Sequence, residues 1–204
     1  MKTHFLKVSL LLGIFIFLSC SDNENNSNSQ QNLPSLTQED RDGLLFMLEE
    51  EKLARDTYSY LYSLWGVNQF SNIKNSEQSH MDAIANELDN YNIAYTILPE
   101  GQFSYPELQN FYDQFVIDGQ ISKLNALSIG ATIEDLDIVD LEEYILETTN
   151  TSIIGIYESL KCGSRNHLRS YVSAIISNGG TYTPQFLSQS EYDEIIEGSH
   201  EQCN

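Results

Sequence analysis

Basic residues are scarce in this chain. Only 10 Lys and Arg stand against 30 Asp and Glu among 204 residues, so the formal net charge is -20 and the isoelectric point is near 4.2. A surface of this charge repels phosphate backbones, and the basic residues are scattered, so we expect no binding to DNA or RNA. An acidic balance of this kind usually serves solubility.

Cysteine and long apolar runs are also scarce. Three cysteines are too few for a disulfide-scaffolded fold or a four-cysteine zinc site. The apolar run near the start, residues 8–18, is only about half as long as the ~20 residues that span a membrane as a helix. No Gly-rich phosphate loop and no hydrolase-like Ser, His and Asp set stands out. Apolar residues still make up 41% of the chain, enough for the core of one domain.

The first 19 residues have the pattern of a signal peptide. Lys2 and Lys7 form a short basic start, and the apolar run that follows has the length expected for such a peptide. Its ending, FLSC at residues 17–20, resembles the lipobox of bacterial lipoproteins, and residues 21–24 resemble the acidic tether start of some surface-displayed lipoproteins. The resemblance implies cleavage before Cys20, a lipid on that cysteine, and anchoring to the outer membrane of a Gram-negative bacterium, on the periplasmic or the outer side. Plain secretion with Cys20 removed is the alternative.

Residues 20–36 are predicted to be a flexible tether, because 21–35 contain a single apolar side chain and cannot offset the entropy of ordering. The folded domain is expected over 37–204. Export would permit a disulfide between Cys162 and Cys203, although two free thiols remain the alternative.

From Thr37 onward the apolar spacing predicts helices. Residues at three- and four-residue steps form stripes in four long segments, at about 38–65, 71–91, 122–148 and 152–178. Thr37 is the expected N-cap of the first, and Gly66 its stop. Short helices are expected before Gly119, in the 92–121 connection, and at 188–196. One long connection lets the second and third long helices run parallel, so the prediction is an all-α, ferritin-like four-helix bundle with one crossover.

Polar groups interrupt these stripes near the middle of each long helix. They are Glu51, Glu77 with His80, Glu134, and His167. Burying several carboxylates together is costly unless they are protonated or bind a cation, and Glu and His from facing helices are common metal ligands. Each group alone has an ordinary interpretation: Glu51 and Lys52 could belong to a solvated face, and His167 could be a hydrogen-bonded core residue.

Several segments resemble a known family. Glu51, Ala54, Arg55 and Tyr58 have the spacing of the first-helix motif of rubrerythrin-type proteins. EEEKLARD (49–56), SEQSHM (76–81), GATIEDLDI (130–138) and GSRNHLR (163–169) are similar to the ferritin-like family catalogued as domain of unknown function 2202. The resemblance covers about residues 40–196. It implies a ferritin-like bundle and no particular activity.

The di-metal pattern of ferritin-like proteins implies a set of ligands here. The set is Glu51, Glu77, His80, Glu134, Asp137 and His167. Where the pattern has a fourth-helix Glu, this chain has Ser164, so one carboxylate is missing. Asp137 could compensate, since with the three glutamates it would supply four negative charges, matching two divalent ions.

Three functional interpretations follow. The first is a membrane-anchored centre with one or two iron or manganese ions, a possible oxidase or peroxide-scavenging oxidoreductase that draws electrons from an external reductant. The second is a non-catalytic surface lipoprotein with a structural or interaction role and a hydrogen-bonded polar core without metal. The third is weak calcium binding by the acidic exterior. The sequence does not indicate an oligomeric state.

Overall fold

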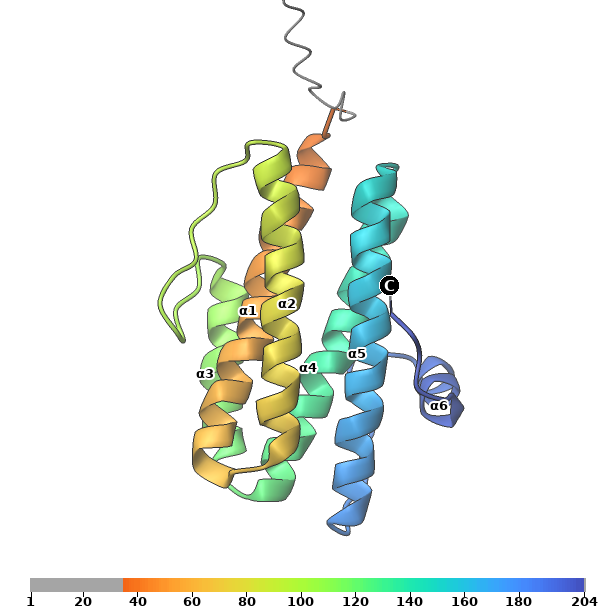
Figure 1. The fold of residues 1–204 in the computed structure, drawn as a ribbon. Helices are drawn as coiled ribbons and strands as arrows, with labels where there is room; N and C mark the ends of the chain where they lie inside the picture. Colours follow the sequence, from red (N-terminus) through yellow and green to blue (C-terminus); the bar gives the residue numbers. More distant parts are fainter. Residues whose placement is uncertain (1–34, 204) are drawn as a thin grey trace, which may run out of the picture. The chain divides into compact units, whose positions relative to one another are not determined.

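The computed structural model describes residues 35–203, and within that range its only regular elements are helices, which confirms the all-α part of the predicted fold class (Figure 1). The helices are α1 (Gln38–Trp65), α2 (Asn68–Asn90), α3 (Pro106–Gly119), α4 (Lys123–Glu147), α5 (Thr151–Ser177) and α6 (Gln189–Glu197). The predicted signal peptide, Cys20 and most of the predicted tether lie outside the described residues. No helix in 35–203 is long and apolar enough to cross a membrane.

The helix ends follow from local chemistry. Thr37 and Asp40 form a reciprocal capping box at the start of α1, and Gly66 ends that helix in a left-handed conformation with φ 60°. Ser188 caps α6 in the same way as Thr37 caps α1. The long helices begin and end within three residues of the predicted bounds; the largest difference is at α2, which begins at Asn68 because the chain reverses within two residues.

The four long helices form two antiparallel pairs. Figure 1 shows α1 beside α2, α4 beside α5, and α2 and α4 running in the same direction, as the long connection between them allows. Across the bundle α1 packs on α4 and α2 on α5, while α3 packs against α1 and α4 and α6 packs on α5. The middles of the four long helices therefore lie at one level.

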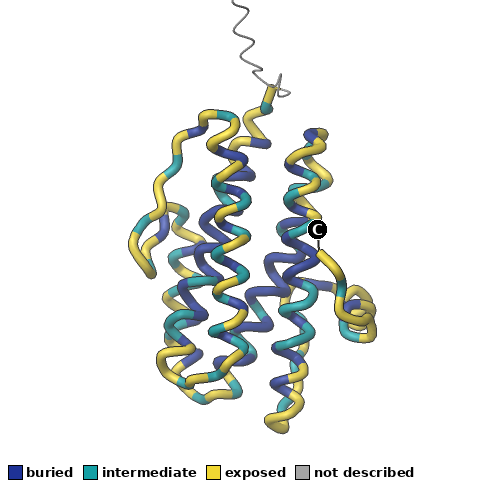
Figure 2. The backbone as a smooth tube through the Cα atoms, viewed as in Figure 1, coloured by how far each residue is buried: buried dark blue, intermediate teal, exposed yellow. Residues whose placement is uncertain are grey.

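The apolar core is divided in two by that middle level. One cluster includes Tyr58, Phe70 and Tyr171, and the other includes Met47 and Leu88. The inward faces of all four helices are buried along their length (Figure 2). The residues between the clusters are polar and largely buried, so the bundle has a polar layer with apolar packing on both sides.

Buried charges hold the crossover segment onto α1. The Lys52 ammonium, 1% exposed, pairs with Asp56 at 2.5 Å and donates to the carbonyls of Pro99 and Gln102, each at 3.0 Å. Glu49 accepts from the backbone of Ser104 at 2.7 Å. The suggestion that Glu51 and Lys52 belong to a solvated face is therefore wrong: the crossover covers Lys52, and Glu51 faces the bundle interior.

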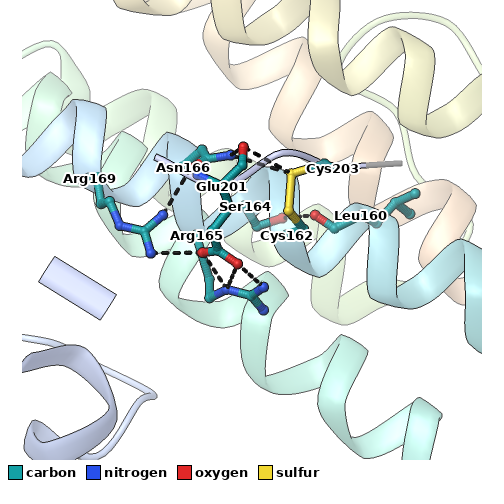
Figure 3. Close-up of a disulfide and its surroundings, with 8 residues drawn as sticks. All are labelled: Leu160, Cys162, Ser164, Arg165, Asn166, Arg169, Glu201 and Cys203. Atoms are coloured by element: carbon teal, nitrogen blue, oxygen red, sulfur yellow. Dashed lines mark hydrogen bonds and ion pairs between the residues drawn. A yellow bond between two sulfur atoms is a disulfide. The ribbon is translucent and has the colours of Figure 1, made fainter. Parts of the chain in front are cut away.

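The C-terminal segment is fastened to α5. Cys162 and Cys203 form a disulfide, which resolves the alternative left open by the sequence (Figure 3). Beside it, Glu201 accepts hydrogen bonds from the guanidinium groups of Arg165 and Arg169. These contacts hold residues 198–203 against the outer face of α5, next to the polar layer of the bundle.

Candidate metal centre

Five predicted ligands meet in the polar layer. Glu51 comes from α1, Glu77 and His80 from α2, Glu134 from α4 and His167 from α5. Glu77 and His80 share one face of α2 because residues three apart are neighbours on a helix. The three carboxylates are at most 2% exposed, and the histidines are 13% and 12% exposed.

Glu77 lies between the two histidines. Its Oε2 is 2.8 Å from His80 Nδ1, and its Oε1 is 2.9 Å from His167 Nδ1. On the outer sides, Glu51 Oε2 is 3.2 Å from His80 Nδ1 and Glu134 Oε2 is 3.3 Å from His167 Nδ1. The two imidazole rings are stacked, with centroids 5.7 Å apart. The order across the bundle is carboxylate, imidazole, carboxylate, imidazole, carboxylate.

These side chains form two groups that share a member. Glu51, Glu77 and His80 make one, and Glu77, Glu134 and His167 make the other; in each, three ligand atoms lie within 4.8 Å of one another. Oε1 of Glu51 and Oε1 of Glu77 are buried without an aligned hydrogen-bond donor among the described residues. Carboxylate oxygens and imidazole nitrogens of this kind would hold divalent cations, and Glu77 belongs to both groups.

The carboxylates and imidazoles of the polar layer strongly shift one another's pKa values. Burial raises the pKa of Glu51 to about 8, against the opposing effect of His80. Burial also acts to raise the pKa of Glu77, but the two histidines hold it well below its ordinary value.

The histidines respond in the opposite sense. Burial would lower the pKa of each ring, yet Glu77 and Glu134 raise the pKa of His167 to about 10, and Glu51 and Glu77 hold that of His80 well above its ordinary value. Without metal, the two imidazolium charges therefore neutralise part of the carboxylate charge. A divalent ion would take over that role and displace the protons.

Asp137 lies beside the five but outside both groups. One of its oxygens accepts a hydrogen bond from Ser164, whose Oγ also lies 3.0 Å from the Leu160 carbonyl oxygen. Its Oδ1 is buried without a donor, and burial together with the Glu51 charge raises its pKa well above the ordinary value. Ser164 thus replaces a carboxylate of α5 with a hydroxyl that positions the α4 carboxylate.

Tyr58 supports the centre from the neighbouring core cluster. Its hydroxyl donates to Glu134 Oε1 at 2.5 Å, and its ring packs on Tyr171, with centroids 5.4 Å apart. A side chain at Gly130 would collide with the Tyr171 ring, 2.5 Å away, so that glycine makes the packing possible. The sequence marks Tyr58 only as a member of the rubrerythrin-type motif, seven residues after Glu51; it did not predict the contact with Glu134.

Gly163 is a second residue that sequence reasoning missed. A Cβ at this position of α5 would lie 2.8 Å from Nε2 of His80, on the opposite helix α2. The glycine therefore leaves the space that the His80 ring occupies. No local signal marks it, since a glycine within a helix is a packing requirement only once the facing helix is known.

Comparisons with known proteins identify a family and a similar protein of known structure. A family model described as "Uncharacterized protein domain (DUF2202)" matches residues 40–199. The uncharacterized protein MJ0754 of Methanocaldococcus jannaschii is 47% identical over 168 residues, which cover 81% of this chain and 91% of that protein. The crystal structure of hypothetical protein MJ0754 superposes with a TM-score of 0.81 at 46% identity, covering 82% of this chain and 97% of the other. The chain therefore belongs to the DUF2202 family, as its helix motifs predicted.

Proposed function

We propose that this chain is a ferritin-like bundle that binds one or two divalent metal ions, iron or manganese, in the polar layer and serves as an oxidase or peroxide-scavenging centre. The observation that carries the proposal is Glu77, whose two oxygens lie against His80 on one side and His167 on the other. One carboxylate common to two ligand groups is the arrangement expected for a bridged pair of ions.

The donor set favours iron or manganese. Two imidazoles with three carboxylates suit these ions better than copper or structural zinc. Ferritin-like di-metal bundles use a Glu from each of two helices and a Glu-x-x-His pair from each of the other two. The candidate ligands of this chain are a single Glu on α1 and on α4, the full pair on α2 and only the His on α5, and the helix directions in Figure 1 agree with that fold. Asp137 would bring the carboxylate charge to -4, opposite two divalent ions.

The bound ions would supply one-electron redox chemistry toward dioxygen or peroxide. The chain itself supplies the ligands, the Tyr58 hydroxyl on Glu134, and two apolar clusters that keep bulk water from the layer. Cys162 and Cys203 are joined to each other, so neither is free for a second metal site, and turnover would require an external reductant.

The localisation of the protein in the cell is also a proposal. We expect the mature chain to be held at the outer membrane through lipid on Cys20, on the periplasmic or the outer side. The disulfide supports export, because such bonds persist mainly outside the cytoplasm. The relative MJ0754 comes from an archaeon, and its name states no function.

Metal analysis tests the proposal. Chain expressed with iron and manganese available should contain one to two metal equivalents, and Glu77→Gln should contain far less. Glu87→Gln is the matched control, since Glu87 is also on α2, 5% exposed, with one buried oxygen lacking a donor. Fewer than ~0.1 equivalents in the parent chain after anaerobic Fe(II) loading would refute metal binding, because the buried charges would then be satisfying one another.

A structural role without metal is the second candidate. It is favoured by the imidazolium–carboxylate distances, which are those of ion pairs. Under that role, chelators would leave the melting temperature unchanged. Under the metal-binding role, chelation should lower it by several degrees, because a ligand bound only to the native state stabilises that state by ~2.7 kcal/mol at 100 times its Kd.

A further inference from the structure

The C-terminal segment forms a strap across the outer face of α5. The strap, residues 198–203, follows α6 and reaches Cys203, whose disulfide with Cys162 ties it to α5 (Figure 3). In its middle, the side chain of Asn166 donates to the Glu201 carbonyl at 3.1 Å and accepts from the Glu201 N–H at 2.9 Å. The strap is therefore fixed at both ends, and Glu201 is held over α5.

The Glu201 carboxylate occupies a site made by two arginines of α5. Arg165 Nε lies 2.9 and 3.1 Å from the two carboxylate oxygens of Glu201, and Arg169 Nη2 donates to Oε1 at 2.7 Å. The two arginines are four residues apart, so they share one face of the helix. Their hydrogen bonds lower the pKa of Glu201 to about 2. The arginine pair, Arg165 and Arg169, is thus a carboxylate-binding site that the chain fills with its own carboxylate.

A cavity adjoins the arginine pair. It lies between α4, α5 and α6, has a volume of about 780 Å³, and is lined in part by Ile138, Phe186 and Ile195. That volume is in the range of sites for small organic molecules. An apolar wall next to a pair of guanidinium groups suits a ligand with an apolar body and a carboxylate head.

The other charged groups of the cavity limit the ligand to one negative charge. Lys161 pairs with Glu158 at 3.2 Å and with Glu142, so this third cation is already neutralised. Three further carboxylates line the cavity, those of Glu143, Glu191 and Glu194. A second carboxylate on the ligand would meet these acidic groups, whereas the first would replace Glu201 at the arginine pair.

We propose that the arginine pair and this cavity bind a small monocarboxylate with an apolar body, and that reduction of the Cys162–Cys203 disulfide opens the site. With the disulfide intact, an external carboxylate competes with Glu201, which is tethered on both sides. After reduction only part-exposed ion pairs and the Asn166 contacts hold the strap, and such pairs contribute little. The effective concentration of Glu201 at the arginine pair then falls. The site shares no residue with the candidate metal centre, so it goes beyond the proposed function.

The disulfide can be reduced from its exposed side. Cys203 is exposed and Cys162 is buried, so the thiolate of an external dithiol would attack Sγ of Cys203. The bond between the two cysteines breaks, Cys162 leaves as a thiolate and takes up a proton, and Cys203 is joined to the reductant. The second thiol of the reductant then displaces Cys203, which also takes up a proton, and the reductant closes its own disulfide. In total, two electrons and two protons pass from the dithiol to the chain.

Octanoate is the probe, and its binding to the purified chain is measured by isothermal titration. The chain reduced with dithiothreitol and the Cys203→Ser variant should both bind octanoate at least tenfold more tightly than the oxidised chain. Dithiothreitol should not change the affinity of Cys203→Ser further. Equal affinities in the oxidised and reduced chains, or no binding to either, would overturn the proposal.

Glu201→Ala tests the site with the disulfide intact. The variant keeps the strap tied to α5 but frees the arginine pair, so it should bind octanoate at least tenfold more tightly than the parent chain when both are oxidised. It also covers the case in which reduction destabilises the fold. An affinity unchanged by Glu201→Ala would contradict a site that this carboxylate holds closed.

Arg165→Gln tests the arginine pair. Among the described residues, the hydrogen bonds of the Arg165 guanidinium all go to Glu201, so the substitution disturbs few other contacts. In the reduced chain it should weaken octanoate binding at least tenfold. Arg41→Gln, which removes an exposed arginine of α1, is the matched control and should leave the affinity unchanged. Full affinity in a folded Arg165→Gln variant would refute the site.

Two further acids test the class of ligand. Acetate has the same carboxylate without the apolar body, and octanedioate has the same chain length with a second carboxylate. Both should bind to the reduced chain at least tenfold more weakly than octanoate. Acetate binding as tight as that of octanoate would show that the cavity takes no part, and equally tight binding of octanedioate would contradict the limit to one negative charge.

Discussion

Gly163 shows how little space surrounds the His80 ring. An added methyl group would lie 2.8 Å from Nε2 and 2.9 Å from Cε1 of that ring, so the imidazole would have to move. We expect Gly163→Ala to weaken metal binding about 10–100-fold, the range observed when residues that orient metal ligands are changed. Isothermal titration with Mn²⁺ measures the effect.

Gly155→Ala is the matched control for this substitution. Gly155 lies on the same helix, is exposed, and has open space where a Cβ would be added. That variant should keep its metal affinity and gain about 0.5–1 kcal/mol of stability, since alanine is the better helix former. Equal affinities in the two variants would show that Gly163 does not position His80.

The pKa values of the layer predict a release of protons. With the pKa of His167 raised to about 10 and that of Glu51 to about 8, both groups are mainly protonated at pH 7 in the metal-free chain. Metal ligands must be deprotonated, so binding at pH 7 should release at least one proton per chain, and affinity should rise with pH toward 10. Titrations in two buffers of different ionisation enthalpy count the protons; a heat independent of the buffer would contradict the ligand assignment.

The residues of the centre were predictable where chemistry alone identifies them. Glu51, Glu77, His80, Glu134 and His167 interrupt apolar stripes, and that interruption is visible without a structure. The burial of Lys52 was not predictable, because it depends on the crossover lying over α1. Asp137 also needed the structure, which places it against Ser164 rather than in either ligand group.

At the scale of elements, Lys52 links α1 to the crossover segment. Replacing it with methionine removes the ion pair with Asp56 and two hydrogen bonds to loop carbonyls. Asp56 keeps its ion pair with Arg55 and its hydrogen bond from the Gly101 amide. We therefore expect the free energy of unfolding to fall by about 3 kcal/mol, the lower end of the range for a broken buried pair. Urea unfolding measures the loss, and hydrogen exchange should increase first in residues 91–105.

Lys123→Met is the control for this experiment. Lys123 is exposed at the start of α4, and such surface substitutions change stability by less than about 0.5 kcal/mol. If Lys52→Met were equally mild, the crossover would be held by its apolar contacts alone.

The bounds of the helices were predictable from short-range sequence signals. Thr37, Gly66 and Ser188 mark ends that depend only on a few adjacent residues, which is why these bounds were predicted closely. The disulfide depends instead on long-range structure. Cys162 and Cys203 are 41 residues apart, and only the path of the C-terminal segment along α5 brings them together.

At the scale of the whole molecule, the formal charge of -20 includes many carboxylates that do not face water. Glu49, Glu50, Glu51, Glu77 and Glu134 are all at most 8% exposed. The acidic composition therefore has two origins, a solvated exterior and a polar interior, and only the first is a matter of solubility.

The predicted anchor is testable on the whole protein. Expressed in a Gram-negative host, the chain should sediment with membranes, since lipid on Cys20 would hold it there. Cys20→Ala should move it to the soluble fraction or stop its processing, because no helix within residues 35–203 can span a membrane. Cys203→Ser is the control, as it also removes a cysteine and should leave the chain with the membranes. A parent chain found wholly in the soluble fraction would favour plain secretion.

The burial of residues 49–52 of α1 limits which substitutions this chain can tolerate. Four consecutive residues, each no more than 8% exposed, occupy a full turn of helix, so that turn has no outward side. Most helices have a solvent-exposed face at which substitutions are tolerated. Here Glu49 and Lys52 fix the crossover while Glu50 and Glu51 face the bundle interior, so random replacement at any of these positions should be tolerated about as poorly as at a core leucine.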